Sequence, residues 1–257
     1  MQGKKIYFAS DFHLGVAAKL TSKEREKKIV RWLASIQDDA HEIYLVGDVF
    51  DFWFEYGTAI PKGYSRLFGK LAELRDRGIP IFFFIGNHDM WMFRYFEEEL
   101  DIPIIRQPII KKINGKTFFI GHGDGLGPGD KGYKILKKIF SNKICQFLFK
   151  WIHPDLGIGL AHFWSQKSRA VSPAMLRFLG EKKEWLVSFC NKKIDTEDID
   201  FFIFGHRHLP IDYTLKNGKS RYINIGEWMH ACSYGVFDGE DMQVLFFENN
   251  EGKVFCK

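Results

Sequence analysis

The sequence predicts an α/β fold in which a buried sheet is completed by antiparallel strands. Short apolar runs rich in Ile, Phe, Val and Tyr have the length and composition of buried strands, and they cover residues 5–10, 42–46, 79–85, 117–120, 200–204 and 222–225. Helical patterns separate the first of these runs, which is typical of an α/β core. Two later runs, at 233–237 and 242–247, flank Asp238 and Gly239, which predicts closing strands joined by a turn.

Two helices are predicted between the first strands. Residues 21–36 begin with a capping-box match, because Thr21 is followed three positions later by Glu24. Residues 64–77 are followed by Gly78, and glycine often ends a helix. Both segments are long enough to cover one face of a sheet.

The segment from residue 131 to 194 interrupts this alternation. It has no convincing strand pattern, and its composition is helical, basic and aromatic. No internal repeat, low-complexity tract or linker rich in Gly and Ser separates it from the rest. We therefore expect a single domain over residues 1–257 with a helical insertion at 131–194.

Bulk composition excludes some classes of protein and leaves others open. The 257 residues are 46% hydrophobic and 27% charged, which fits a globular chain rather than a disordered one. The net charge of +5 suits an anionic substrate, a nucleic acid or an acidic membrane surface alike. The cysteines form no C-x-x-C pair, so reduced thiols are expected rather than a cysteine zinc site. Without a signal-peptide pattern or a run near the ~20 apolar residues of a membrane span, a cytoplasmic protein is expected.

Five of the apolar runs lead directly into side chains that bind metal ions. The motifs are Asp11-x-His13, Gly47-Asp48-x-x-Asp51, Gly86-Asn87-His88-Asp89, Gly121-His122-x-Asp124 and Gly205-His206-x-His208. In open α/β sheets, sites form beyond the carboxyl ends of the strands, so these side chains are expected to converge. Each motif alone is weak, because a single strand-end His or Asp is usually structural. Five such motifs in order are hard to attribute to chance.

The residue types and their spacing predict two divalent ions. In Asp11-x-His13 and His206-x-His208, the period of two in an extended chain would send both side chains to one face. Oxygen and nitrogen ligands without a thiolate suit Mn, Fe, Zn or a similar ion. Asp48 is the expected bridging carboxylate, because an anion between two cations relieves their repulsion. Two ions ~3.5–4 Å apart can make water a nucleophile near neutral pH and clamp both oxygens of an in-line displacement at phosphorus.

The series of motifs resembles the calcineurin-like metallophosphoesterase superfamily, over residues 11–208. The resemblance implies a four-layer αββα sandwich of two sheets. It also implies two ligand sets that share one carboxylate. The first ion would be held by Asp11, His13, Asp48 and His208, and the second by Asp48, Asn87, His122 and His206.

His88 and Asp89 are the catalytic candidates. In much of the superfamily a His at the position of His88 lies over the phosphate and helps to protonate or stabilise the leaving oxygen, with Asp89 tuning it. The resemblance gives Asp51 and Asp89 the role of orienting ligands and catalytic side chains. Asp124 acts similarly or is a plain turn residue.

Nearly the whole chain is also similar to the UDP-2,3-diacylglucosamine diphosphatases of lipid A biosynthesis. The similarity lies in the stretch from Gly121 through Tyr133, in the helical insertion and in the run from Gly205 to Trp228. It implies hydrolysis of the pyrophosphate of UDP-2,3-diacylglucosamine to UMP and 2,3-diacylglucosamine 1-phosphate (lipid X). It also implies Mn²⁺ as the usual metal and peripheral docking on the cytoplasmic face of the inner membrane.

The insertion itself fits a lipid substrate. An apolar stripe is predicted for Ile135, Ile139, Phe147, Leu148, Trp151 and Ile152. Lysines that suit phosphate or anionic lipid are interspersed at positions 134, 137, 138, 143 and 150. We expect a substrate cap with an acyl-sized apolar cleft that opens toward the metal ions. On periodicity alone, a helix pair with a solvated lysine face is the competing interpretation.

Further substrate contacts follow from the similarity. His88 and Asp130 are expected to contact substrate, and Asp130 lies eight residues after His122, as a substrate-contacting acid of the family does. Ser165 and Arg169 align with polar or basic groups of the family's cap. For Arg207 the alternatives are a contact with phosphate and a solvent-facing side chain, and the second is expected. The best-known enzymes of this kind have Arg where this chain has His88, a departure that leaves the exact reaction open.

Two other functions compete. One is a nuclease or cyclic-nucleotide phosphodiesterase on the same core. A nuclease favours a broad basic groove with stacking aromatics, whereas the basic and aromatic residues here concentrate in the insertion, so no nucleic acid partner is expected. The other is a non-catalytic scaffold, but no metal ligand of the pattern is missing. The sequence supports neither a dinucleotide site nor a P-loop, and it does not indicate an oligomeric state.

Overall fold

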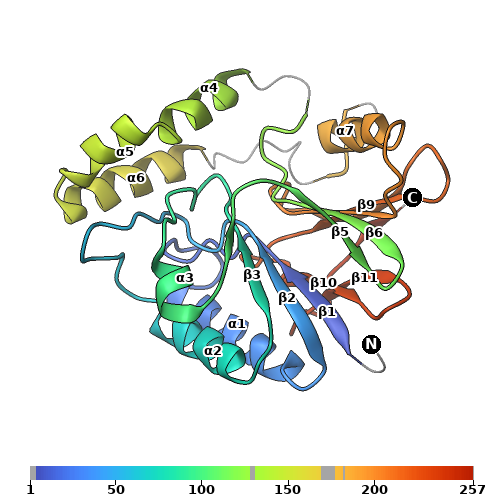
Figure 1. The fold of residues 1–257 in the computed structure, drawn as a ribbon, viewed down its shortest axis with the longest axis horizontal. Coiled ribbons are helices and arrows are strands. Elements are labelled where there is room, and N and C mark those ends of the chain that lie inside the picture. The colour runs from blue at the N-terminus through green and yellow to red at the C-terminus, as the bar shows by residue number, and fades with distance from the viewer. Residues whose placement is uncertain (1–3, 128–130, 169–176, 182, 257) are drawn as a thin grey trace.

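Two sheets of six strands each form the centre of the protein (Figure 1). The computed structural model describes residues 4–127, 131–168, 177–181 and 183–256, without the side chains of 131–133, 136, 162–168 and 256. In spatial order, the first sheet consists of β11 (Met242–Phe246), β10 (Ser233–Phe237), β1 (Lys5–Ala9), β2 (Ala40–Val46), β3 (Ile81–Phe84) and β4 (Ile104–Ile105). The second consists of β12 (Phe255–Cys256), β8 (Pro210–Thr214), β9 (Arg221–Ile225), β7 (Phe201–Phe204), β6 (Lys116–Ile120) and β5 (Ile109–Ile113).

The inner strands of both sheets run parallel. β1, β2, β3 and β4 pair in parallel, as do β6, β7 and β9. Antiparallel strands complete the sheets, because β10 pairs antiparallel with β1 and β11, and β5 and β8 pair antiparallel with β6 and β9. The carboxyl ends of the parallel strands therefore face the same side within each sheet, which is where the predicted ligand motifs begin.

The alternation of side chains along each strand fills two separate cores. Ile6 and Phe8 of β1 point into the layer between the sheets, whereas Tyr7 and Ala9 point to the outer face. On that outer face pack α1 (Ser22–Ile36), α2 (Ser65–Asp76) and α3 (Tyr95–Leu100). On the outer face of the second sheet packs α7 (Trp185–Lys193). The result is the four-layer αββα sandwich that the motifs predict.

The helix boundaries follow from local chemistry. Thr21 Oγ1 accepts a hydrogen bond from the main-chain nitrogen of Glu24 at 3.3 Å, and the Glu24 carboxylate accepts one from the nitrogen of Thr21 at 2.9 Å. This is the predicted capping box, which satisfies N–H groups that a helix start leaves without partners. α2 ends just before Gly78, whose φ of +80° suits glycine.

Every predicted strand is present, and four further strands were missed. β4 and β12 have only two residues each. β5 carries Lys111 and Lys112 inside an edge strand, and β8 begins with Pro210. An edge strand accepts charge because one side of its main chain faces away from the ladder, and proline is tolerated as the first residue of a strand. Their sequences therefore lack the continuous apolar signature of the buried strands.

The regular elements described between residues 131 and 194 are all helices, but these helices lie at two different places in the fold. α4 (Lys131–Phe140), α5 (Lys143–Lys150) and α6 (Pro154–Ser168) project to one side of the sandwich (Figure 1). α7, in contrast, buries Leu186, Val187 and Cys190 against the second sheet. We call α4, α5 and α6 the helical arm. Within the described part of the chain, no helix is long and apolar enough to cross a membrane.

Candidate metal centre

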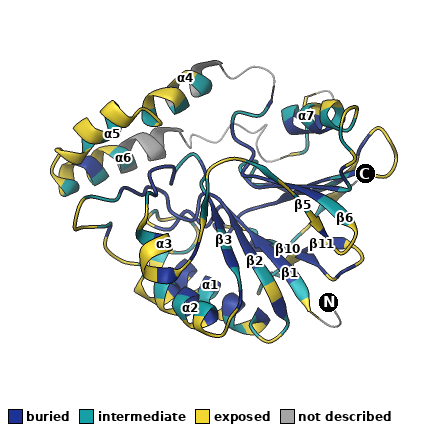
Figure 2. Ribbon diagram, in the orientation of Figure 1, coloured by how far each residue is buried: buried dark blue, intermediate teal, exposed yellow. Residues whose placement is uncertain are grey.

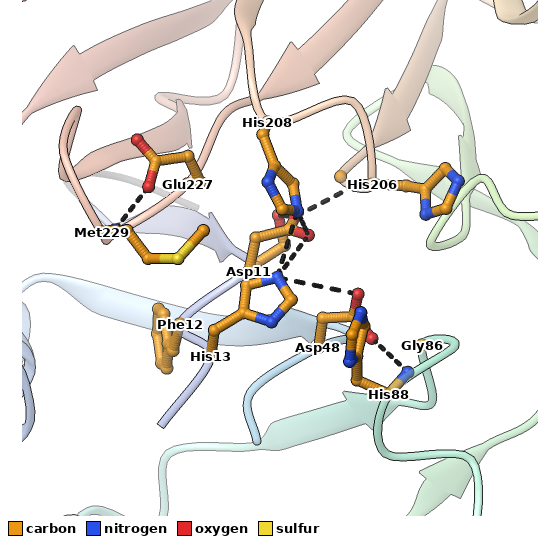
Figure 3. A network of polar contacts seen from close by, with 12 residues as sticks. Asp11, Phe12, His13, Asp48, Gly86, His88, His206, His208, Glu227 and Met229 are labelled. Carbon is orange, nitrogen blue, oxygen red and sulfur yellow. Dashed lines mark hydrogen bonds and ion pairs between the residues drawn. The ribbon is translucent and has the colours of Figure 1, made fainter. Parts of the chain in front are cut away.

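The predicted ligand side chains converge between the carboxyl ends of the two sheets (Figure 3). Asp11, Asp48 and Asn87 come from the loops after β1, β2 and β3 of the first sheet. His122 and His206 come from the loops after β6 and β7 of the second sheet. Residues almost 200 positions apart thus meet at one place, as the positions of the motifs predicted: His208 lies 195 positions after His13 and contacts it.

The first group of ligands surrounds Asp11 Oδ1 and His13 Nε2. His208 Nε2 lies 3.0 Å from Asp11 Oδ1 and 3.1 Å from His13 Nε2. His13 Nε2 lies 3.6 Å from Asp11 Oδ1 and 3.9 Å from Asp48 Oδ2. We call Asp11, His13, Asp48 and His208 the first metal site.

The second group shares the same oxygen of Asp48. His122 Nε2 lies 3.1 Å from Asp48 Oδ2 and 3.3 Å from Asn87 Oδ1. His206 Nδ1 lies 2.8 Å from Asn87 Oδ1. We call Asp48, Asn87, His122 and His206 the second metal site. Asp48 Oδ2 therefore stands between the two sites, where a bridging carboxylate belongs.

The donor set and its spacing fit divalent ions. Nitrogen and oxygen ligands lie ~2.0–2.2 Å from an ion such as Zn²⁺, so neighbouring ligand atoms are expected ~3–3.5 Å apart. Most separations within the two groups fall close to that range. Burial lowers the pKa of His206 to about 4, so its ring is neutral and offers a lone pair. The sites hold oxygen and imidazole donors without a thiolate, as predicted.

The main chain at these ligands is not extended, which corrects the period-two argument. The φ angles of Asp11, His13, Asp48, His206 and His208 are +54°, +44°, +52°, +62° and +54°, all left-handed. Such conformations are sterically costly for residues with a Cβ. As a result His206 and His208 do not point to one site. His208 joins the first metal site and His206 the second, the division that the superfamily resemblance implies.

Other groups fix the orientation of the histidine rings. Asp51 Oδ1 lies 3.4 Å from His13 Nδ1. The main-chain oxygen of Val46 lies 2.8 Å from His122 Nδ1, and a carbonyl can only accept, so Nδ1 carries the proton of that bond. In both rings this arrangement directs Nε2 toward a metal site. Burial alone would lower the pKa of His122, but the Asp48 carboxylate raises it well above the usual value.

Two glycines make room for this arrangement. A Cβ on Gly86 would overlap the carboxylate of Asp48 and lie 2.6 Å from its main-chain nitrogen. A Cβ on Gly47, whose φ is +86°, would lie 2.6 Å from His122 Nδ1. Only glycine lets the two loops approach each other and the ligands this closely.

His88 and Asp89 occupy different surroundings. His88 Nδ1 lies 3.1 Å from the main-chain oxygen of Asp51, and its ring packs edge-on against His13 with centroids 4.8 Å apart. Asp89 is buried, and its carboxylate accepts bonds from the main-chain nitrogens of Gly86 at 2.7 Å and Val49 at 2.8 Å. Asp89 therefore joins the loops after β2 and β3, and it is Asp51 rather than Asp89 that meets the His88 ring.

Two expectations for polar residues near the site were incomplete or wrong. Arg207 does not face solvent: its side chain is 9% exposed, and Nη2 lies 3.1 Å from Glu184 Oε1. Asp124 is more than a turn residue, because it pairs with Lys137 of α4 and so links the loop after β6 to the helical arm. In both cases the partner comes from the 131–194 region.

Three predicted substrate contacts cannot be placed. Asp130 and Arg169 lie outside the described residues. Ser165 belongs to α6, but its side chain is also outside the described part. These three remain predictions.

Sequence reasoning missed Arg25 and Glu227. Arg25 is fully buried and donates to the main-chain oxygens of Phe12 at 2.7 Å and His13 at 2.6 Å. Glu227 is also buried and accepts bonds from the nitrogens of residues 229–231 (Figure 3). Arg25 occurs in an amphipathic helix between Glu24 and Glu26, so its sequence context is that of a surface residue.

The space between the helical arm and the core was expected to hold an acyl-sized apolar cleft. Along much of this interface aromatic side chains fill it instead. Phe149 of α5 packs against Trp91 and Phe54 with centroids 4.7 and 4.8 Å apart. Nearer the metal centre, a cavity of about 410 Å³ opens beside His122, between the core loops and α4. Its walls are partly apolar, and its rim is basic.

Comparisons with known proteins identify the family of this chain. The calcineurin-like phosphoesterase family matches residues 4–210. UDP-2,3-diacylglucosamine hydrolase of Porphyromonas gingivalis is 36% identical over 96% of this chain and 99% of its own. The enzyme of the same name from Yersinia pseudotuberculosis is 27% identical over 93% and 98%. Among solved structures, the E. coli phosphoesterase Yfce covers 95% of this chain and 93% of its own at 18% identity, with a TM-score of 0.46. The chain is thus a hydrolase that belongs to the calcineurin-like metallophosphoesterase family.

Proposed function

We propose that this protein hydrolyses the pyrophosphate of UDP-2,3-diacylglucosamine, giving UMP and 2,3-diacylglucosamine 1-phosphate, with two divalent ions, Mn²⁺, as cofactors. The observation that carries the proposal is the sharing of Asp48 Oδ2 between two sets of ligands. Such paired sites serve in-line displacement at phosphorus. The substrate is inferred from the relative in Porphyromonas gingivalis, which is similar over nearly the full length of both chains.

The ions supply Lewis acidity and lower the pKa of water when they are bound. The chain's own residues hold them and act on the substrate. His88 donates its Nδ1 proton to the main-chain oxygen of Asp51, so Nε2 is the nitrogen that we assign to the phosphate. When the ring is doubly protonated, Nε2 carries a proton as well, and that N–H stabilises the leaving oxygen or transfers its proton to it. The main-chain nitrogen of His88 donates to Asp48 Oδ1, and that of Val49 donates to Asp89, so the loop of His88 is held against the loop of Asp48.

A direct assay tests this function. Purified protein with Mn²⁺ should release UMP from UDP-2,3-diacylglucosamine, and Asp48→Asn should abolish the release. At equal metal, single-stranded DNA and cyclic nucleotides should turn over at least about a hundredfold more slowly. Faster cleavage of a nucleic acid or a cyclic nucleotide than of the lipid nucleotide would replace the proposal by another phosphodiesterase activity. No release from any of these substrates would favour a non-catalytic scaffold.

The helical arm supports peripheral contact with the membrane that would contain this substrate. Among the described residues, nine of the twelve large hydrophobic side chains that are exposed lie on the arm or in its turns, including Trp151 at 77% exposure and Leu156 at 70% (Figure 2). Exposed lysines accompany them at positions 138, 143 and 150. Apolar side chains beside cations are the combination that inserts at an anionic lipid surface. We propose that the arm docks on the cytoplasmic membrane face and caps the lipid substrate.

A vesicle-binding assay distinguishes docking through the arm from nonspecific hydrophobic adsorption. The double variant Trp151→Ser, Leu156→Ser should lose most of its binding to phosphatidylglycerol vesicles. The matched control is Ile110→Ser, Leu245→Ser, because these two residues are 49% and 39% exposed but lie on the sheets. The control should bind as the unaltered protein does. Equal loss in both double variants would refute docking through the arm.

A further inference from the structure

The cavity beside His122 has the character of an anion-binding pocket. Among its described lining residues, four are cations, Arg106 from the core and Lys134, Lys137 and Lys138 from α4, and one is a carboxylate, Asp124. Its volume of about 410 Å³ falls within the usual range for small-ligand sites. The excess of positive charge favours an anionic occupant over a neutral one.

The pocket is connected directly to the reaction centre. His122, a ligand of the second metal site, forms part of its wall, and Gly123 and Asp124 continue that wall. A phosphate held between the two metal sites therefore has this pocket as its neighbour on the His122 side. The aromatic packing of Phe149 on Trp91 and Phe54 lies elsewhere along the arm. The two ends of an elongated substrate thus meet different surroundings.

The remaining walls suit a flat, weakly polar group. Phe84, Ile85, Ile105, Pro108 and Leu126 supply apolar surface behind the cationic rim. A nucleoside phosphate has a ring system that packs on apolar surface and a phosphate that pairs with lysine and arginine. An acyl chain would use the apolar walls, but it would gain nothing from the positive charge of the rim.

The four cations differ in how firmly they are held. Arg106 donates to the main-chain oxygen of Met92 at 2.7 Å, and Lys134 donates to that of Gly127 at 2.8 Å. Lys137 pairs with Asp124. Lys138 is exposed on the same helix and lines the pocket, so its charge can be changed without disturbing the anchors of the rim.

From these observations we infer that the pocket is the subsite for the nucleoside monophosphate half of the substrate. The inference rests on the proposed function, because it assigns one half of that substrate to a place. Lys138 then contributes to binding of the nucleotide and to KM, whereas the metal ligands determine kcat.

Charge reversal at Lys138 tests the assignment by equilibrium binding, without turnover. UMP should bind the unaltered protein, and Lys138→Glu should weaken this binding by about tenfold. Lys192→Glu is the matched control, because Lys192 is exposed on α7 and its replacement changes the net charge equally. The control should change UMP binding by less than about twofold. Inorganic phosphate should bind more weakly than UMP, since it lacks the nucleoside.

Three outcomes would overturn the inference: no measurable UMP binding, equal loss in the Lys138 and Lys192 variants, or phosphate binding as tight as that of UMP. The steady-state counterpart is a raised KM for UDP-2,3-diacylglucosamine in Lys138→Glu with kcat nearly unchanged. The two hypotheses fail separately. If UMP binding depends on Lys138 but the lipid nucleotide is not cleaved, the proposed function is wrong and the pocket remains a nucleotide subsite. If the lipid nucleotide is cleaved but UMP binding does not depend on Lys138, the proposed function is kept and the assignment of the pocket is wrong.

Discussion

The Nε2 atoms of His13 and His208 lie 3.1 Å apart in the first metal site. Both nitrogens belong to one candidate ligand set, and a divalent ion between them would bind a lone pair from each ring. We therefore expect metal binding to stabilise the fold. Saturating Mn²⁺ at about 100-fold above its Kd should add ~2.7 kcal/mol, which corresponds to a Tm increase of roughly 5–10 °C for a chain of this size. Scanning calorimetry of chelated and reloaded protein measures it, and an unchanged Tm would contradict the metal sites.

The sharing of Asp48 predicts different losses from two ligand variants. Asp48→Ala removes a ligand from both sites and should leave close to no bound metal. Asn87→Ala removes a ligand from the second site alone and should leave about one ion per chain. Elemental analysis after gel filtration gives the stoichiometry, and Asp198→Ala serves as the control because that carboxylate is exposed and belongs to neither metal site. Equal metal loss in the Asp48 and Asn87 variants would argue against a bridging role.

Replacement of His88 should affect turnover more than metal content. His88→Ala removes the ring nitrogen assigned to the phosphate and should lower kcat by about 10²–10⁴, with both ions retained. His88→Arg should recover part of the activity, because a guanidinium also binds phosphate. Steady-state kinetics with parallel metal analysis checks both variants. Loss of an ion in His88→Ala would instead make this residue a ligand.

Two glycines provide a matched test of loop packing. Gly86→Ala would place a Cβ against Asp48, so the variant should lose activity and destabilise the protein. Gly69 lies inside α2, where an added Cβ meets nothing within 4 Å, so Gly69→Ala should stabilise the fold by ~0.5–1 kcal/mol. Urea denaturation measures both. Similar effects at the two positions would mean that the close approach of Gly86 to Asp48 is not a tight constraint.

Arg25 should be required for the first metal site, although its guanidinium does not itself bind a metal ion. Its guanidinium also donates to the main-chain oxygens of Val16 at 2.7 Å and Leu20 at 3.1 Å, and so fixes the loop that carries His13. Arg25→Met leaves several carbonyls without donors, at ~1–3 kcal/mol for each buried one. We expect lower stability and preferential loss of one ion. Full retention of both ions in the folded variant would show that the loop holds its shape unaided.

The placement of the site was predictable because it depends on strand ends. Apolar runs identify the strands, parallel strands end on a common side, and polar ligands directly after them must meet there. The helix over residues 21–36 was predictable for a similarly local reason, the reciprocal bonds of Thr21 and Glu24. Each of these features depends on residues close together in the chain.

Other features depend on contacts between segments that no local pattern specifies. The division of His206 and His208 between the two sites follows from left-handed main chain, which an alternating motif does not reveal. The pairing of Arg207 with Glu184 joins residues 23 positions apart. Arg25 was missed because it binds main-chain oxygens. Every residue has such an oxygen, so these partners leave no pattern in the sequence.

The position of β1 has a consequence for folding during translation. β1 lies between β2 and β10, with Ile6 opposite both Glu42 and Phe237. As the polypeptide leaves the ribosome, the edge of β1 that pairs with β10 has no partner until residues 233–237 have emerged. Nascent molecules are thus exposed to mispairing over more than 200 residues of synthesis, and a stall before β10 would yield a product that chaperones or proteases must handle.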